Sequence, residues 1–200
     1  MTLKQKTAAL EKIAAEIRVC KICQKDKIGM AVPGEGNADA DIAFIGEAPG
    51  KKEAETGRPF IGRAGKLLRG LLADIGIKDA DVYITSPVKY LPVYVTPNEA
   101  DIAHGRIHLF KQLDIIQPKV VVLMGNTAML AVLQEKFSVA EQHGTIIERG
   151  GMAYFLSYHP AAPLYAPKLR EVIKADFLKL KKLVRKSKGT RFASAGKARL

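Results

Sequence analysis

The chain has 200 residues, of which 48% are hydrophobic, and its formal net charge is +12. This length suits one domain with a sizeable core, and the composition excludes a largely disordered chain. No apolar run approaches the roughly 20 residues of a membrane helix, and the N-terminus lacks a secretory h-region, so we expect a cytoplasmic monomer that enters no membrane.

The N-terminal segment is expected to form an amphipathic helix over residues 2–18. Thr2 and Gln5 have the spacing of a capping box. Apolar residues then fall on one stripe of the helix: Leu3, Leu10, Ile13, Ala14 and Ile17. Cys20 and Cys23 follow as a C-x-x-C pair, which is not a disulfide framework.

The middle of the chain alternates strand patterns with helix patterns. After a loop expected at residues 25–40, the strands are expected at 42–45, 82–85, 120–124 and 153–156. Helices are expected at 64–75, 97–117, 127–135 and 168–184. Thr96 and Pro97 are predicted to be the N-cap and first residue of the second helix. This alternation predicts an α/β fold, with a parallel sheet covered on both faces.

The positive charge is concentrated near the C-terminus. Residues 168–200 contain 12 Lys and Arg residues against two acidic ones. Such a segment binds polyanions by releasing counterions, or it is a solvated tail that aids solubility. We expect one domain over residues 1–185, followed by a flexible basic tail over 186–200.

A stiff turn, Gly46-Glu47-Ala48-Pro49-Gly50, follows the strand expected at residues 42–45. Two glycines and a proline force a sharp bend, and an α/β sheet usually places its ligand crevice after such a strand. Neither the phosphate-binding P-loop pattern nor the dinucleotide fingerprint G-x-G-x-x-G fits this stretch. The loop is therefore not expected to bind nucleotide phosphates.

Three sequence blocks define two motifs. Residues 46–53 read G-E-A-P-G-x-x-E, residues 57–65 read G-x-P-F-x-G-x-A-G, and residues 157–162 contain His-Pro at a predicted strand end. Together they resemble the signature of the family-4 uracil-DNA glycosylases, the thermostable iron–sulfur type, over most of the chain. The resemblance implies a three-layer α/β/α fold with a central four-stranded parallel sheet. It also implies a monofunctional glycosylase that excises uracil from single- or double-stranded DNA in base-excision repair.

The resemblance assigns roles to several motif residues. His159 would donate to O2 of the leaving uracil, where negative charge develops. Phe60 would stack on the flipped base, although most Phe side chains are simply core. We expect these two rings to face one cleft from opposite sides. The other residues expected to bind the substrate are Gly46, Glu47, Ala48, Pro49 and Ser86.

The carboxylates of the first motif have two open interpretations. Glu47 stabilises the deoxyribosyl cation and can reach a water, or it only braces its own loop through backbone amides. Glu53 is the weaker candidate for the same role. Ser86 stands where the family has Asn, and its hydroxyl has one donor where an amide both donates and accepts. Selectivity for uracil is therefore expected to differ from that of the family.

The family's [4Fe–4S] cluster needs four cysteines, of which Cys20 and Cys23 are present. Tyr90 and Gly105 stand at the other two positions. The favoured interpretation is that the cluster is lost, that no cofactor is bound, and that the two cysteines are vestigial. The alternative is a zinc site completed by His104 and His108, which share a helix face.

The loop after His159 is expected to contact DNA. Leu164 or Tyr165 would enter the minor groove beside the flipped nucleotide, and Lys168 and Arg170 would bind phosphates. The alternative is a hydrophobic plug between strand and helix. Other functions stay open at this point. One is a superfamily member of altered base specificity, or a DNA-binding protein with weak or lost catalysis. Another is a redox or metal protein that uses the cysteine pair.

Overall fold

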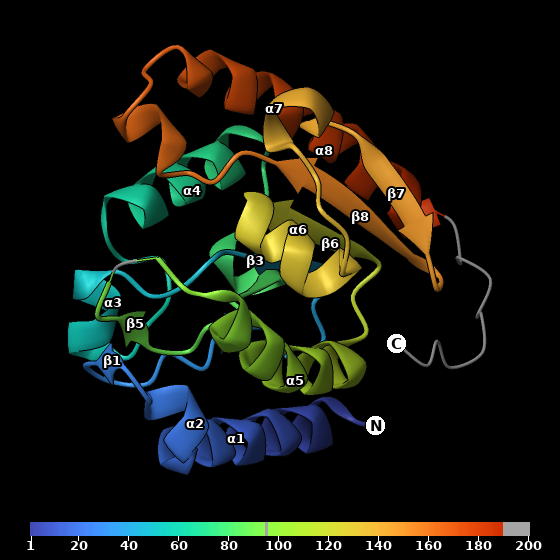
Figure 1. Cartoon of the computed structure of the whole chain (residues 1–200). Helices are drawn as coiled ribbons and strands as arrows, with labels where there is room; N and C mark the ends of the chain where they lie inside the picture. The colour runs from blue at the N-terminus through green and yellow to red at the C-terminus, as the bar shows by residue number, and fades with distance from the viewer. Residues whose placement is uncertain (95, 190–200) are drawn as a thin grey trace.

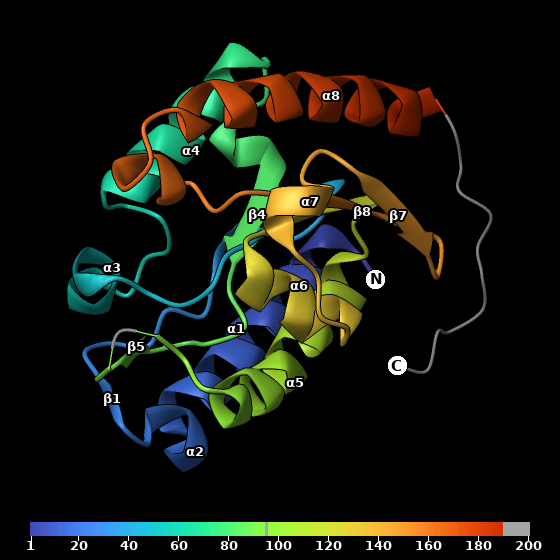
Figure 2. The same ribbon diagram turned by 45° about the horizontal axis from the view of Figure 1, so that its top comes forward.

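The computed structural model describes residues 1–94 and 96–189, in which a mixed sheet is covered by helices on both faces (Figures 1 and 2). The helices are α1 (Leu3–Val19), α2 (Lys21–Gln24), α3 (Lys51–Thr56), α4 (Arg63–Asp74), α5 (Glu99–Ile116), α6 (Asn126–Leu133), α7 (Val139–Gln142) and α8 (Leu169–Gly189), with 3-10 turns η1 (Asp79–Asp81) and η2 (Ala162–Leu164). The strands are β1 (Lys27–Ile28), β2 (Glu35–Gly36), β3 (Ile42–Ile45), β4 (Val82–Thr85), β5 (Leu91–Pro92), β6 (Val120–Met124), β7 (Ile146–Arg149) and β8 (Met152–Ser157).

The main sheet has six strands in the order β2-β4-β3-β6-β8-β7. The four inner strands run parallel, and the two edge strands run antiparallel to their neighbours. The expectation of a four-stranded sheet is therefore wrong in strand number. It missed β2 because two residues carry no hydrophobic pattern, and it missed β7 because exposed residues dominate that strand.

Two cores lie on opposite faces of the sheet. In β3, Ile42 and Phe44 pack with α4 and α8, whereas Ala43 and Ile45 pack with α5 and α6. Successive side chains of a strand point to opposite faces, so a continuous apolar run predicts burial on both sides. The α/β class and the three layers are confirmed, and Figure 2 shows α8 and α4 on the face away from α5.

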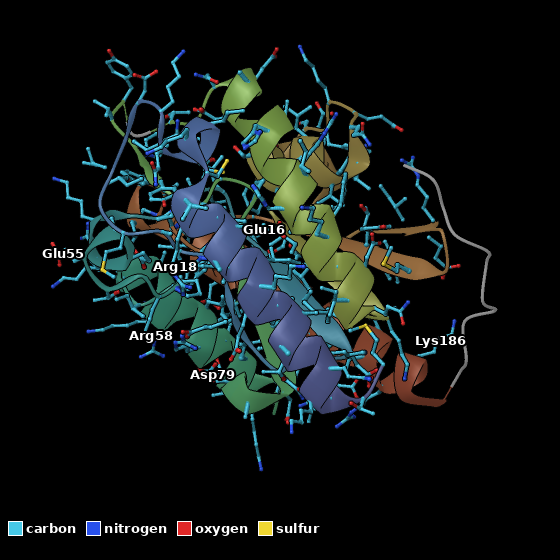
Figure 3. All side chains as sticks on the ribbon, turned by 90° about the horizontal axis from the view of Figure 1, so that it is seen from below. Glu16, Arg18, Glu55, Arg58, Asp79 and Lys186 are labelled. Atoms are coloured by element: carbon cyan, nitrogen blue, oxygen red, sulfur yellow. The ribbon has the colours of Figure 1, made fainter. Side chains whose placement is uncertain are left out.

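The helix at the N-terminus packs outside the second layer. The capping box predicted for Thr2 and Gln5 is present. Seen from below, α1 lies beside α5 (Figure 3), and the Glu16 carboxylate pairs with Lys111 Nζ at 2.8 Å. Ile17 is fully buried in this layer. The α1 helix thereby brings the two cysteines toward α5.

Several expected boundaries move. Asn98, rather than Thr96, caps α5, because its side chain accepts from Asp101 N in a capping box. Residues 25–40 contain the short strands β1 and β2 and are not only loop. Helix α8 runs through Gly189, past the expected start of the tail at 186, and residues 190–200 lie outside the described part. Within that part, no helix has the length and apolar character to cross a membrane.

Candidate active site

The carboxyl ends of the four parallel strands meet at one edge of the sheet. Ser86, Gly46, Gly125 and His159 follow β4, β3, β6 and β8 respectively. Two backbone hydrogen bonds join these ends: Gly46 N to Thr85 O and Gly125 N to Ser157 O, both at 2.9 Å. Since ligands of open α/β sheets bind outside this edge, residues far apart in sequence meet there in one candidate site.

Phe60 and His159 are direct neighbours in this site. Their ring centroids are 5.7 Å apart, with an angle of 37° between the planes. A base between two ring faces needs about 7 Å, twice the roughly 3.5 Å contact distance, so these two rings do not sandwich a base face to face. The expectation that they face one cleft from opposite sides stays a prediction. A Cβ on Gly46 would approach Phe60 to 2.6 Å and His159 Nε2 to 3.7 Å. Glycine at position 46 therefore lets the Phe60 ring lie directly against the backbone at the end of β3.

The loop carrying Phe60 is held in a strained conformation. Phe60 has φ +53°, which is uncommon for a bulky residue, and its side chain is 9% exposed. Its ring also belongs to the hydrophobic core beneath α4. The core role considered from sequence is therefore present, and it does not exclude the stacking role. Glu53 Oε1 accepts from Ile61 N at 2.9 Å and from Gly62 N at 2.8 Å. Glu53 thus positions the loop and satisfies two amides at the start of α4.

His159 has a defined hydrogen bond on one nitrogen. Ala161 N donates to Nδ1 at 3.1 Å, so a neutral imidazole there carries its proton on Nε2, the nitrogen that lies nearest Gly46. Burial lowers the pKa of His159 below 6.5, against the smaller opposing effect of the Glu47 and Glu53 carboxylates. His159 is therefore a neutral donor at pH 7.

Glu47 is anchored from the neighbouring helix. Its Oε2 accepts from Thr127 Oγ1 at 2.6 Å, which ties the β3 loop to the start of α6. The brace is thus a side-chain hydroxyl rather than the backbone amides considered from sequence. Along the same loop, Ala48 is half-buried beside a small core cluster and Pro49 is buried. The negative charge of Glu47 partly offsets the lowering of the His159 pKa by burial.

Ser86 lies at the edge of the sheet with its proton already engaged. The hydroxyl donates to Val88 O at 2.8 Å, and the residue is 5% exposed. What remains for a ligand is the acceptor capacity of Oγ. An Asn at this position would offer both a donor and an acceptor, so the structure sharpens the contrast drawn from sequence.

The loop after His159 presents apolar side chains to solvent. Leu164 is 42% exposed and Tyr165 is 87% exposed, so the alternative of a buried hydrophobic plug is wrong. Lys168 and Arg170 are exposed nearby. A groove of about 410 Å³ passes Leu164 between α4 and α8. Its basic lining residues are Arg63, Lys66, Arg170 and Lys174.

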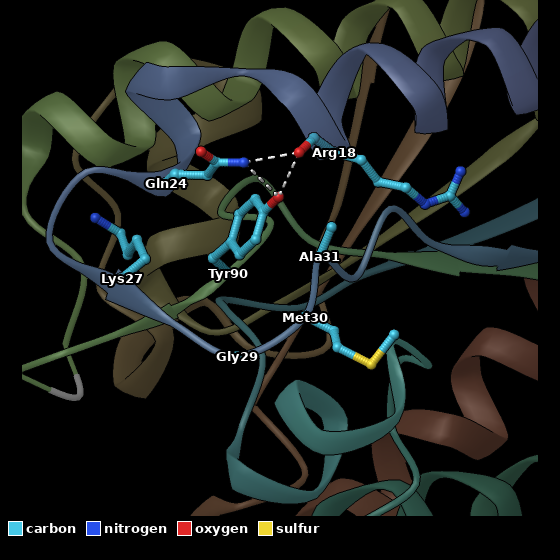
Figure 4. A pocket seen from close by; sticks show the side chains of 7 residues that line it. All are labelled: Arg18, Gln24, Lys27, Gly29, Met30, Ala31 and Tyr90. Atoms are coloured by element: carbon cyan, nitrogen blue, oxygen red, sulfur yellow. Dashed lines mark hydrogen bonds between the residues drawn. The ribbon is translucent and has the colours of Figure 1, made fainter.

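Two cysteines and two histidines converge away from the sheet edge. The ligand atoms of Cys20, Cys23, His104 and His108 all lie within 4.8 Å of one another. Tyr90 stands beside them, where the family has its third cysteine. Its hydroxyl donates to the carbonyl oxygen of Arg18 at 3.2 Å, and it lines a separate pocket of about 330 Å³ (Figure 4).

Sequence reasoning missed residues that only the topology brings into place. Thr127 was expected merely to open a helix, and Gly125 was given no role. Arg63 and Lys66 line the basic groove, yet Arg63 was only a variable motif position and Lys66 only part of the helix expected at 64–75. The one available signal was that β6 is an inner strand, since the residues after any inner strand face the same edge as Gly46.

Comparisons with known proteins identify the family to which this chain belongs. Residues 33–181 match the model of the Uracil DNA glycosylase superfamily. The chain is 38% identical to the Type-4 uracil-DNA glycosylase of Archaeoglobus fulgidus, over 92% of this chain and 98% of that protein. It is also 38% identical to the Type-4 enzyme of Sulfurisphaera tokodaii, over 88% and 84% of the two chains. The Thermotoga maritima Type-4 enzyme is 36% identical, over 88% and 95%.

Proposed function

Because this chain belongs to the uracil-DNA glycosylase superfamily, we propose that it excises uracil from DNA by hydrolysing the N-glycosidic bond, as a step of base-excision repair. The observation that carries this proposal is His159, a buried neutral imidazole whose Nε2–H lies beside Phe60 and Gly46. A donor for the leaving base and a ring on which the base stacks are two of the groups that cleavage of a flipped base requires.

His159 would stabilise the leaving base. As the bond between C1′ and N1 breaks, its electron pair moves onto uracil and negative charge develops at O2. A fixed donor aimed at O2 strengthens in the transition state and so lowers the barrier. A neutral donor suits this step, since it is already in place before charge appears. With the two rings adjacent, the base would stack on the part of Phe60 that His159 leaves free.

Glu47 would act on the sugar. Loss of the base leaves positive charge on the deoxyribose, which a nearby carboxylate offsets. Water then adds to C1′, and its proton passes to the Glu47 carboxylate. Thr127 would fix that carboxylate through its 2.6 Å hydrogen bond. Glu53 would serve as a positioning residue, because its Oε1 accepts hydrogen bonds from two loop amides.

DNA would lie across the basic groove and the exposed loop. Arg63, Lys66 and Arg170 line a groove that Leu164 borders, which places cations for phosphates beside an apolar wedge. Tyr165, at 87% exposure, is the second wedge candidate. Lys168, exposed just before α8, adds to the positive surface.

The test is release of uracil from a labelled oligonucleotide that holds one uracil, read as alkali cleavage on a gel. After treatment with the protein, alkali should cleave this strand at the abasic site and leave a matched strand with thymine intact. His159→Ala should lower the single-turnover rate by about 10²–10³-fold, as loss of one oxyanion donor does. An unfolding curve of the variant controls for misfolding.

Two results would reject the proposal. DNA binding without base release, for uracil, hypoxanthine and xanthine alike, would favour a binding protein with lost catalysis. Undiminished cleavage by a folded His159→Ala protein would remove His159 from the mechanism. The near full-length match to Type-4 enzymes favours catalysis over the binding function.

A further inference from the structure

His108 is a buried side chain whose two ring nitrogens lack hydrogen-bond partners. The residue is 6% exposed, and neither Nδ1 nor Nε2 has a partner among the described residues. A buried polar group without a partner destabilises the folded state, because it loses its hydrogen bonds to water. The other buried polar side chains of this layer are paired; Gln112, one turn further along α5, bonds to Pro33 O at 2.8 Å. The unsatisfied imidazole therefore points to a missing ligand.

Three further metal-binding side chains surround this imidazole. His104 lies one turn earlier on α5, with ring centroids 5.6 Å from those of His108. Cys20 Sγ lies 3.2 Å from His104 Nε2, and Cys23 is buried beside it. All four ligand atoms fall within 4.8 Å of one another. The arrangement is a compact set of two sulfurs and two nitrogens.

The family's [4Fe–4S] cluster does not fit these residues. Such a cluster needs four thiolates. Tyr90 holds the third position, and its hydroxyl is bonded to backbone carbonyls of α1. Gly105 holds the fourth, and a Cβ there would lie 2.2 Å from Pro87 O, so no side chain can enter without a backbone shift. Neither position supplies a ligand.

The distances suit one ion better than a cluster. In a tetrahedral zinc site with Zn–S of about 2.3 Å and Zn–N of about 2.0–2.1 Å, ligand atoms are roughly 3.3–3.8 Å apart. The 3.2 Å separation of Cys20 Sγ and His104 Nε2 is slightly shorter than an edge of such a tetrahedron. The other pairs of ligand atoms are at most 4.8 Å apart, so small movements of the side chains would bring all four atoms to tetrahedral positions around one ion.

We propose that Cys20, Cys23, His104 and His108 bind a single structural zinc ion, in place of the family's iron–sulfur cluster. Two thiolates and two imidazoles form a standard closed zinc site, with no open position for catalysis. The ion would give His108 the partner it lacks. It would also join the α1–α2 turn to α5, a link between segments about 80 residues apart in sequence. The proposal is independent of the glycosylase activity.

The first experiment measures metal in the full-length protein. The chain, purified without chelators or an affinity tag that binds metal, should contain about one zinc per molecule by elemental analysis, without iron or acid-labile sulfide. Removal of zinc followed by Co²⁺ addition should give the visible absorption of tetrahedral cobalt and thiolate-to-cobalt charge transfer. ZnCl₂ should displace the cobalt at one equivalent.

Variants separate this site from adventitious binding. Cys20→Ser should weaken the thiolate-to-cobalt charge-transfer band, and His108→Gln should lose the absorption of tetrahedral cobalt. Each variant should bind zinc at least tenfold more weakly than the wild type. His143→Gln, which removes a histidine outside both sites, should still hold one zinc. If a variant fails to fold, the cobalt spectrum and zinc content of the wild-type chain still decide the question.

Three outcomes would overturn the proposal. Iron with acid-labile sulfide would show a cluster, including the type held by two cysteines and two histidines. A Cys20–Cys23 disulfide in the freshly purified protein would show a redox pair. Failure to take up Zn²⁺ or Co²⁺ by fully reduced, folded protein would show that the four side chains only pack together.

Discussion

The backbone N–H of Ala161 donates to Nδ1 of His159 at 3.1 Å, and this bond decides which imidazole nitrogen carries the proton. Because burial lowers the pKa of His159 below 6.5, we predict a neutral ring protonated on Nε2 at pH 7. Nitrogen-detected NMR of imidazole-labelled protein distinguishes the two tautomers. A proton on Nδ1, or a charged ring at pH 7, would contradict the mechanism.

The same shift predicts the pH dependence of base release. A lowered pKa means that His159 stays neutral as the pH falls through 6.5, where an ordinary histidine titrates. The single-turnover rate should therefore be level from pH 8 to pH 6.5 and lose the contribution of neutral His159 only at lower pH. The control is the pH profile of the His159→Ala variant. If the wild-type rate has an inflection at or above pH 6.5 that is missing in this variant, the pKa of His159 is not lowered.

The hydrogen bond from Thr127 to Glu47 separates the two roles considered for that carboxylate. Glu47→Gln keeps an acceptor for the hydroxyl but removes the charge. If the charge stabilises the sugar cation, the rate should fall by more than about tenfold, or 1.4 kcal/mol, with stability little changed. Single-turnover rates and urea unfolding of the same samples measure both.

Thr127→Val supplies the complementary variant, since it keeps the shape and removes the donor. It should lower the rate less than Glu47→Gln and should cost about 0.5–1.5 kcal/mol of stability. If Thr127→Val and Glu47→Gln lowered the rate equally, and if both losses matched the loss of stability, Glu47 would only brace its loop.

How far the sequence predicts this molecule depends on the range of the interactions. The strands β3, β4 and β6 are predictable because each is a short apolar run between turn residues. The edge strand β2 is not, since Glu35 and Gly36 become a strand only by pairing with Ile84 and Tyr83. Local patterns identify inner strands, while the edges of the sheet depend on tertiary pairing.

The same limit applies to the site. The motif residues Gly46, Phe60 and His159 are recognisable from their sequence context, and the structure brings them together. That the rings of Phe60 and His159 face one cleft from opposite sides stays a prediction, because a cleft with two opposite walls is a statement about tertiary geometry. Likewise the spacing of His104 and His108 on α5 does not by itself predict a metal site. Only the folded structure, in which α2 lies against α5, shows that these histidines meet Cys20 and Cys23.

Ser86 is predicted to limit discrimination between bases. Its proton is held by Val88 O, so Ser86→Ala should change the rate on uracil by less than about threefold. Ser86→Asn should instead raise kcat/KM for uracil relative to hypoxanthine and xanthine, because an amide pairs with both the N3–H and O4 of uracil. Parallel assays of the three substrates measure this ratio. An unchanged ratio in a folded Ser86→Asn protein would place position 86 outside base recognition.

The basic groove between α4 and α8 is predicted to bind phosphates. Replacing Arg63 and Lys66 by Ala should weaken binding to all DNA sequences and reduce the slope of log K against log salt by about 1 to 2. The matched control replaces Lys4 and Lys12, exposed on α1 across the sheet, which should leave the slope unchanged. Fluorescence anisotropy over a salt series measures both. Equal effects of the two pairs would show only the influence of net charge.

Lys89 should make stability depend on pH. Its ammonium nitrogen is fully enclosed and contacts the oxygens of Pro33, Thr85 and Gln112 at 2.8–3.1 Å, with no carboxylate partner among the residues that the structure describes. Burial lowers the pKa of Lys89 from 10.5 to about 7. Between these two values the unfolded chain holds a proton that the folded chain has released. The free energy of unfolding therefore rises with pH across this window.

The measurement compares the wild-type chain with Lys89→Met in urea at pH 7, 8 and 9. Met is expected to fold, because Pro33 O still accepts from Thr85 Oγ1 and from Gln112 Nε2, both at 2.8 Å. The stability of the wild type relative to the variant should increase with pH, by at most about 1.4 kcal/mol per unit. Lys12→Met, at an exposed position, should show no such trend. A constant difference from pH 7 to 9 would mean that the three oxygens keep Lys89 protonated in the folded protein.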